Sequence, residues 1–250
     1  MLQDTHIHVQ DIKDQAGVKL FLEALEAGGF RRLINCAITP ADWPLVRQLA
    51  DEHPILTPSF GVHPWFADIV EKGWESRLEG FLNTPGALAG EMGLDKARKN
   101  IDWDVQKEVF TSQLKIAAVL KKPFSVHCVR AWEETLTLIS AHSSGQPFLL
   151  HSFNGSVETA ARISVMGGYC SFPVKAIHSF DDAAADVFRS VALERILIET
   201  DFPYQIKWTA PVDYMEAVRM AYQKAAALRG IPLDVLMAAV FENGRAFLGK

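Results

Sequence analysis

Short apolar runs alternate with helix-like stretches along the whole chain, and this alternation limits the folds that the chain can adopt. Eight runs have the length and residue content of strands: 2–8, 31–38, 55–62, 86–93, 123–128, 147–153, 167–172 and 195–201. Helix-like stretches lie between or after them: 15–28, 40–52, 104–122, 131–142, 156–166, 181–192 and 211–229. Strands that alternate with helices form a parallel sheet covered by helices. Eight units in 250 residues predict an α/β fold, a single (β/α)8 TIM barrel that forms one domain over residues 1–250.

The competing arrangement is an open, doubly wound sheet. Its dinucleotide-binding version carries a GxGxxG turn after a strand, and this sequence contains no such turn. The clearest helix has Asp104 as its candidate N-cap, and Pro123 follows just beyond its last lysines. The pattern therefore favours the closed barrel, with helices of ordinary length outside it.

The charge balance limits how the chain could hold a polyanion. The net charge is −5, whereas proteins that bind nucleic acid without specificity usually carry a basic surface. Positive charge for such a substrate would have to come from a few side chains or from bound metal. The three cysteines, Cys36, Cys128 and Cys170, are scattered and form no CxxC pair. This spacing argues against a disulfide framework and against a cysteine-rich zinc site.

The beginning of the chain indicates no targeting or membrane segment. The stretch MLQDTHIHVQDIKD carries acidic residues and histidines where a signal peptide needs a basic and then an apolar segment. No apolar run approaches the roughly 20 residues of a membrane helix. We therefore expect a cytoplasmic protein that does not act at a membrane, and nothing in the sequence indicates an obligate protein partner.

Histidines and acidic residues stand where the predicted strands end. These residues are His6, His8, His63, Glu91, His127, His151 and Asp201. In an α/β barrel, the carboxyl ends of the strands form the rim on which active sites are built. Histidines that merely pack in a core would not be expected to gather at one rim. The shared position therefore predicts one functional site.

The first strand shows how two of these residues could reach one ion. Asp4, His6 and His8 are spaced two apart, so strand alternation would place them on one face. Asp4 is then expected to contact a ligand histidine and fix the orientation of its ring without binding the ion itself. Trp65, next to His63, is expected either to stack on a base or sugar or to pack its own loop.

The residue types indicate the kind of metal. Four imidazoles and two carboxylates, without His63, make a mixed nitrogen and oxygen set that suits Zn, Mn, Fe or Ni better than a thiolate or all-oxygen site. Six ligands are too many for one catalytic ion that keeps an open position. They suit two ions bridged by one carboxylate, which activate a water and clamp the attacking and leaving oxygens. The electrophile expected for that water is phosphorus or a carbonyl carbon.

Taken in order, these segments resemble the TatD-like metal-dependent hydrolases, a branch of the amidohydrolase superfamily. The resemblance runs from residue 4 to about residue 204 and rests on DTHIH, GVHPW, GEMGLD, PFSVHC, HSFNG and IETDFPY. It implies a TIM barrel, two divalent ions (Zn, Mg, Mn or Ni) and a deoxyribonuclease of the 3′–5′ exonuclease type. Single-stranded DNA is the substrate that we expect from it.

The resemblance also implies a role for each residue of the site. His6, His8 and Asp201 would hold the first ion, and His127 and His151 would hold the second. Glu91 would bridge the two ions and is, with Asp201, expected to be catalytic. His63 would contact the substrate phosphate, and Asp201 would also take up the proton of the attacking water.

The sequence departs from the family around the substrate. Many members have an arginine two residues after the histidine of strand 123–128, where this chain has Val129 and then Arg130. After Asp201, members often continue into a basic stretch, whereas here Lys207 is the one cation of PYQIKWTAPVDY, and the loop SFPVKAIHSFDD also differs. An enzyme that acts on a small ester, lactone or amide is therefore the alternative. A non-catalytic barrel that serves as a binding module is the third hypothesis.

Overall fold

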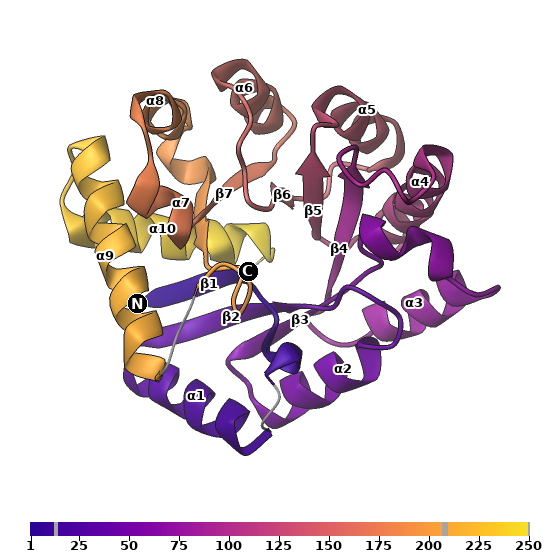
Figure 1. The fold of residues 1–250 in the computed structure, drawn as a ribbon, viewed down its shortest axis with the longest axis horizontal. Coiled ribbons are helices and arrows are strands. Elements are labelled where there is room, and N and C mark those ends of the chain that lie inside the picture. Colours follow the sequence, from indigo (N-terminus) through magenta and orange to yellow (C-terminus); the bar gives the residue numbers. More distant parts are fainter. Residues whose placement is uncertain (13–14, 207–209, 250) are drawn as a thin grey trace.

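Eight parallel strands form one continuous sheet in the computed structural model, which describes residues 1–12, 15–206 and 210–249. Each strand pairs with the next one along the chain, in the order β1 to β8. The strands are β1 Leu2–Ile7, β2 Phe30–Cys36, β3 Leu56–Phe60, β4 Leu88–Asp95, β5 Phe124–Val129, β6 Phe148–Leu150, β7 Tyr169–Pro173 and β8 Ile196–Glu199. The predicted (β/α)8 barrel is therefore confirmed, and Figure 1 looks onto the face where the strands end.

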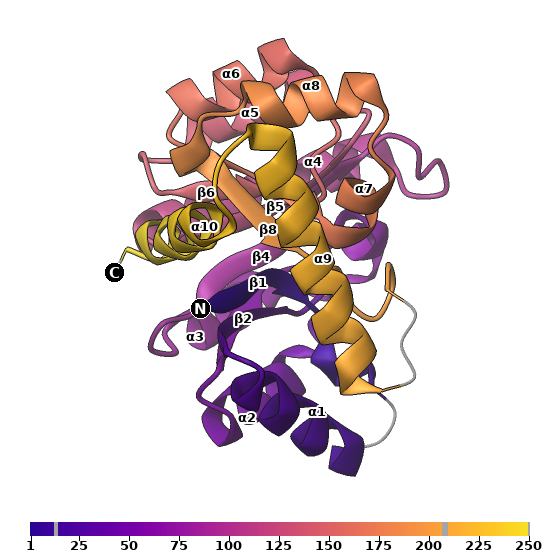
Figure 2. The same cartoon turned by 90° about the vertical axis from the view of Figure 1, so that its left-hand side faces the viewer.

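Helices surround the sheet and follow the strands along the chain (Figures 1 and 2). They are α1 Gln15–Ala27, α2 Trp43–Glu52, α3 Trp74–Leu82, α4 Trp103–Val119, α5 Trp132–His142, α6 Val157–Val165, α7 Val174–Ser179, α8 Asp182–Ser190, α9 Pro211–Arg229 and α10 Leu233–Phe247. Short 3₁₀ turns are η1 Val9–Asp11, η2 Pro64–Ile69 and η3 Leu193–Arg195. Within the described ranges, the structure contains no helix both long and apolar enough to span a membrane.

The helix predictions need correction at one start and at three helices outside the predicted ranges: α3, α7, which lies in the segment expected to be the loop SFPVKAIHSFDD, and α10. The helix predicted to begin with Asp104 as its N-cap is capped two residues earlier, because the Asp102 carboxylate accepts hydrogen bonds from the amides of Asp104 and Val105. Helix α3 was not predicted. This helix is short, and its N-cap is Gly73, which has a left-handed backbone conformation. Glycine offers no side-chain cap by which the start of the helix could be predicted.

The barrel closes where the first strand meets the segment after the last strand. The Asp201 amide donates to the His6 carbonyl at 3.0 Å, and the His8 amide donates to the Phe202 carbonyl at 2.7 Å. These bonds fasten Asp201 beside the two histidines of β1. Closure of the sheet is thus what unites residues almost 200 positions apart in the sequence.

Side chains from alternate strands fill the barrel interior in layers, as in other TIM barrels. A separate apolar cluster includes residues from every even-numbered strand, Ile34, Cys36, Leu88, Leu149 and Leu197, together with Tyr169 and Phe247. Each odd-numbered strand contributes one fully buried small polar residue: Thr5, Ser59, Ser125 and Ser171. The Thr5 and Ser171 hydroxyls hydrogen-bond at 2.9 Å. The larger apolar core lies between the sheet and the helices.

Asp4 joins β1, the segment after β8 and helix α9. Its buried carboxylate accepts from the His6 and Thr200 amides at 3.0 Å each and from the hydroxyls of Thr200 and Tyr214. Burial raises the pKa of Asp4 to about 7, although the hydrogen bonds from Thr200 and Tyr214 oppose the rise. Asp4 is thus a structural anchor of the barrel closure.

We predict that Tyr214→Phe lowers the free energy of unfolding by about 1–3 kcal/mol, because it leaves the buried carboxylate short of one donor. Denaturant unfolding monitored by circular dichroism measures this difference. Tyr222→Phe is the matched control, because Tyr222 lies buried on the same helix but does not hydrogen-bond Asp4. Equal stability of the two variants would contradict the anchoring role.

Candidate metal centre

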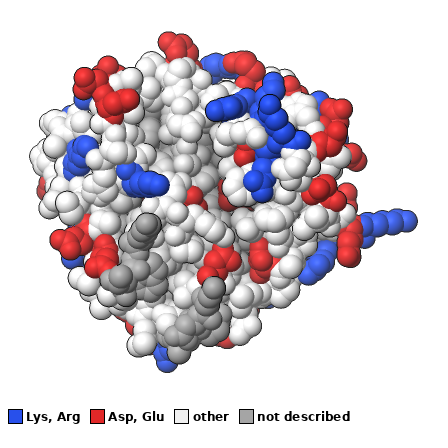
Figure 3. Space-filling view, viewed as in Figure 1, with Lys and Arg blue, Asp and Glu red and all other residues white. Residues whose placement is uncertain are grey.

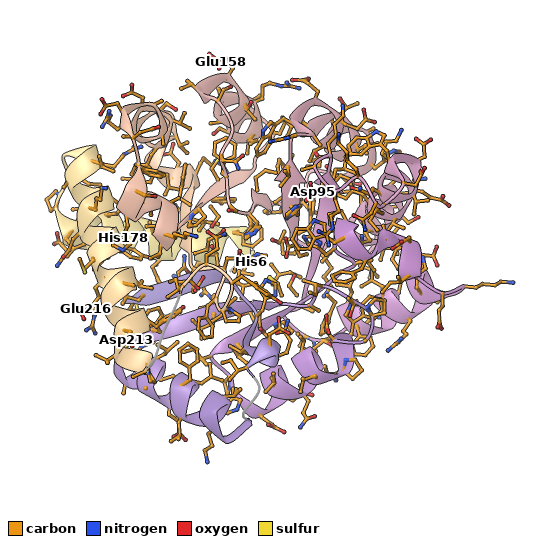
Figure 4. The ribbon with its side chains drawn as sticks, viewed as in Figure 1. His6, Asp95, Glu158, His178, Asp213 and Glu216 are labelled. Atoms are coloured by element: carbon orange, nitrogen blue, oxygen red, sulfur yellow. The ribbon has the colours of Figure 1, made fainter. Side chains whose placement is uncertain are left out.

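The seven residues singled out at the predicted strand ends converge on one region of the barrel. A cavity of about 260 Å³ is lined by six of them, His8, His63, Glu91, His127, His151 and Asp201, together with Ile38, Trp65, Phe66 and Tyr204. His6 lies buried beneath it and stacks on His151 with ring centroids 3.7 Å apart. Figure 4 shows His6 at the middle of this face, well apart from the exposed His178 on α7.

Glu91 occupies the centre of the cluster. Its Oε2 atom lies 3.1 Å from His6 Nε2 and 3.9 Å from His8 Nε2. Its Oε1 atom lies 3.1 Å from His127 Nδ1, 3.4 Å from His63 Nε2 and 3.9 Å from His151 Nε2. The two oxygens of one carboxylate therefore face two different sets of imidazoles. Burial opposes ionisation, but the neighbouring histidines outweigh it and hold the pKa of Glu91 well below its ordinary value.

One potential ligand group combines His6, His8 and Asp201, the trio expected for the first ion. His6 Nε2 and His8 Nε2 are 3.1 Å apart, and His8 Nε2 lies 3.4 Å from Asp201 Oδ1. Burial disfavours the charged form of Asp201, yet the hydrogen bond with His8 and the charge of His151 lower its pKa. Asp201 is therefore ionised at neutral pH, as a metal ligand has to be.

A second group combines His63, Glu91 and His127 and so differs from the predicted ligands of the second ion. The Trp65 amide donates to His63 Nδ1 at 3.1 Å. Burial outweighs the attraction of Glu91 and lowers the pKa of His63 to about 4, so the ring is neutral at neutral pH. A neutral ring that accepts at Nδ1 carries its proton on Nε2. Nε2 of His63 is therefore a donor, and it lies 3.4 Å from Glu91 Oε1 at the wall of the cavity.

His151 belongs to a third group, with His6 and Glu199. Its Nδ1 lies 2.7 Å from Glu199 Oε1, which also accepts from the Ser152 amide at 2.8 Å. Burial lowers the pKa of His151, but the carboxylates of Glu199 and Glu91 more than compensate and raise it to about 10. The ring presents Nε2 toward Glu91 while Glu199 holds its other nitrogen.

Two carboxylates in the cluster had been given no role from the sequence, Glu199 and Asp95. The Asp95 Oδ2 atom accepts from Trp65 Nε1 at 2.6 Å and lies 3.4 Å from His127 Nε2. Both residues stand in segments already singled out, Asp95 in GEMGLD and Glu199 in IETDFPY. Glu199 is two residues before Asp201, so strand alternation could have identified it. Trp65 packs its loop against Asp95 and is 40% exposed where it lines the cavity.

The expectation that Asp4 shares a face with the histidines and orients one of their rings is wrong. Asp4 contacts Tyr214 of α9 and the His6 backbone, whereas the His6 ring lies against His151. The register between β1 and β2 shifts between Asp4 and Ile7, and the irregularity breaks strict alternation.

Cys36 supplies the contacts that Asp4 was expected to make. Its carbonyl lies 2.7 Å from His8 Nδ1, and its Sγ atom lies 3.5 Å from His6 Nδ1. A carbonyl can only accept, so His8 donates from Nδ1, and Nε2 is the nitrogen that faces Glu91 and Asp201. The contact with Cys36 thus orients the His8 ring so that Nε2 points to the centre of the cluster.

The donor set fits divalent metal ions. Ring nitrogens and carboxylate oxygens meet at 3–4 Å in a buried place, and a divalent cation bound there could replace the ring protons that face the carboxylates. Imidazole and carboxylate ligands favour Zn, Mn, Fe or Ni over a soft thiolate metal. Asp201 also has a positive φ of 53°, a conformation that Asp tolerates and that recurs at functional sites.

A comparison with protein families gives one match over almost the whole chain. The family described as TatD related DNase matches residues 3–249. The human 3'-5' RNA nuclease TATDN2 is 31% identical over 195 residues, which cover 74% of this chain but only 26% of the human protein. The Escherichia coli K12 metal-dependent hydrolase YcfH is 27% identical over 253 residues, covering 97% and 93% of the two chains.

Solved structures agree on the fold. The crystal structure of YJJV, a TatD homologue from Escherichia coli K12, superposes with a TM-score of 0.88 at 22% sequence identity. The match covers 100% of this chain and 98% of the other. A TatD family hydrolase from Entamoeba histolytica gives a TM-score of 0.86 at 17% identity, with 98% and 97% covered.

Proposed function

The chain belongs to the TatD-related DNase family of metal-dependent hydrolases, and on that premise we propose that it hydrolyses phosphodiester bonds of single-stranded DNA with two divalent ions. The 3′–5′ exonuclease direction and the action of residues 1–250 as one domain are parts of the same proposal. The observation that carries it is the position of Glu91, whose two oxygens face separate imidazole sets.

In this proposal His6, His8 and Asp201 hold one ion, His127 and His151 hold the other, and Glu91 bridges them. Bound ions would acidify a water and offset the negative charge of the diester. The Asp201 carboxylate is ionised and receives the proton of the attacking water, as the new bond to phosphorus forms and one P–O ester bond breaks. Gln205 Nε2 donates to Asp201 Oδ2 at 2.8 Å and holds that carboxylate in place.

His63 serves the substrate rather than the metal. Its neutral ring directs an N–H toward the cavity, where a non-bridging phosphate oxygen would accept it. The tautomer supports this assignment, because a protonated Nε2 offers no lone pair to an ion. His63 would thereby stabilise the charge that grows on phosphate oxygens as water attacks.

We predict that His63→Ala lowers kcat/KM for an oligonucleotide by about 10- to 100-fold, the value of one hydrogen bond to a charged group. The metal content of the protein should not change. Steady-state kinetics and elemental analysis measure the two quantities. His178→Ala is the matched control, because His178 lies exposed on α7. Loss of an ion from His63→Ala would instead make His63 a ligand.

RNA is the second candidate substrate, because the human relative with 31% identity is named an RNA nuclease. The test is a set of end-labelled single strands of DNA and RNA, with small esters, lactones and amides as rivals, each with and without chelator. Mg, Mn, Zn and Ni are added in separate reactions. Shortening of DNA from its 3′ end supports the proposal. If only the small esters, lactones or amides are turned over, and chelator stops that turnover, the proposed nuclease activity is wrong and a small-molecule hydrolase takes its place.

A further inference from the structure

Four basic side chains gather where β4 and β5 end, although the chain as a whole is acidic. Lys96, Arg98, Lys99 and Arg130 are all exposed, and we call them the basic rim. The Lys96 amide donates to the Val129 carbonyl at 2.9 Å, which holds the residues after β4 beside those after β5. Figure 3 shows Lys and Arg side chains grouped over this part of the strand-end face, next to its central hollow.

The basic rim adjoins the wall of the cavity. The Arg98 guanidinium lies over the Trp65 ring, 4.4 Å from its centroid. Trp65 lines the cavity and is tied through Asp95 to His127. A chain of direct contacts therefore leads from the candidate metal centre to the first of the four cations.

The charges of the basic rim are not neutralised by ion pairs with the described residues. Across residues 1–12, 15–206 and 210–249, none of the four cations lies within 4.0 Å of a carboxylate oxygen. Three acidic residues of the segments that follow β4 and β5 contact other groups: Asp102 caps α4, Asp104 pairs with Lys107, and Glu133 pairs with Arg162. Four positive charges are thus left facing solvent beside the cavity.

On the side of β1 and β2, two carboxylates lie near the cavity, and Arg77, which donates to the Pro40 carbonyl at 3.0 Å, is a cation beside them. Tyr204, which lines the cavity, donates its hydroxyl to the exposed Asp11 at 2.7 Å. Asp42 follows β2 on the same side and accepts from the amides of Ile38 and Thr39. Lys207, the cation noted after Asp201, lies outside the described residues. A polyanion leaving the cavity would therefore be drawn toward β4 and β5.

We propose that the basic rim binds the backbone phosphates of a single-stranded polynucleotide whose terminal phosphodiester lies in the cavity. The inference rests on the proposed function and extends it from the scissile bond to the strand that follows. Phosphate contacts by Lys and Arg supply affinity without reading sequence. Exposed cations at one side of a site also set the path of the strand.

The test compares substrates that do and do not reach the basic rim. K96A/K99A is the decisive variant, because neither lysine contacts a residue that lines the cavity. For a labelled strand of roughly 12 nucleotides, within the span of known single-strand sites, we expect kcat/KM to fall about tenfold. The small diester bis(para-nitrophenyl) phosphate does not extend from the cavity to the basic rim, so the rate of its hydrolysis should be unchanged. DNA and RNA strands are measured in parallel, because their phosphates are chemically alike.

Salt dependence and direct binding give two further measurements. A plot of log kcat/KM against log salt should become shallower by about 0.7 for each phosphate contact removed. Fluorescence anisotropy of the labelled strand with metal-depleted protein should show about tenfold weaker binding by K96A/K99A. The matched control is K19A/K115A, which removes two exposed cations from the outer faces of α1 and α4.

The outcomes separate this inference from the proposed function. Loss confined to the long strand, with a shallower salt slope, supports the basic rim. Unchanged long-strand kinetics in K96A/K99A, or an equal loss in the control variant, overturns it while phosphodiester hydrolysis stands. If the wild-type protein cleaves neither the strand nor the small diester, the proposed function fails first and this inference fails with it.

Discussion

Glu91→Gln is expected to remove both activity and bound metal. The carboxylate lies in contact distance of five imidazoles and is buried among them, so its charge serves both halves of the centre. Loss of residues that only support a metal ligand already costs about 10–100-fold in metal affinity or activity. A bridging carboxylate should cost more than the upper end of that range. Elemental analysis and oligonucleotide turnover measure the two losses together.

The control for this variant is Glu79→Gln, which makes the same chemical change on the exposed face of α3. It should keep the metal content and turnover of the unmodified protein. Thermal unfolding in chelator shows whether Glu91→Gln still folds before its activity is interpreted. A folded Glu91→Gln protein with full metal-dependent turnover would show that Glu91 does not bridge ions.

Asp201→Asn should lower kcat about 10²- to 10⁴-fold, the usual contribution of a positioned acid–base group. Asn is the informative substitution because Asp201 has a φ of 53°, and Asn also adopts this left-handed conformation without strain. The amide keeps the size of the side chain but loses its negative charge and its capacity to accept the proton of water.

Metal content distinguishes the two tasks assigned to Asp201. If Asp201 is mainly the proton acceptor, the Asp201→Asn protein retains its ions and loses turnover. If Asp201 is mainly a ligand, an ion is lost together with turnover, and added metal restores part of the activity. Turnover within about a factor of ten of the original protein, below the expected range, would rule out both tasks.

The fold could be predicted because it rests on features that are local in the sequence. Short apolar runs between helices define the eight strands, and the number of units favours a closed barrel. The first and last residues of the strands were harder to predict. Strand β4, for example, ends at Asp95 rather than at residue 93. Helix α3 escaped prediction because its left-handed Gly73 gives no side-chain cap. Such ends depend on hydrogen bonds that residue type does not reveal.

The predicted strand ends indicated that the histidines and carboxylates of the site would lie together. They did not indicate which further groups contact those side chains. Glu199 and Asp95 contact the rings of His151 and His127, and neither had been recognised from the sequence. The position of Asp4 was misjudged because a register shift in β1 breaks alternation. The Cys36 carbonyl that orients His8 belongs to the backbone of another strand. Tertiary pairing alone brings such an acceptor to the ring.

A metal titration distinguishes a two-ion phosphodiesterase from an enzyme that needs one ion or none. Protein stripped by chelator is titrated with Mn or Zn while bound metal and cleavage of a single-stranded oligonucleotide are measured on the same samples. The two-ion account predicts no cleavage in the stripped protein and a maximum when about two ions are bound per chain. Cleavage by the metal-free protein, or full activity with a single bound ion, would contradict it.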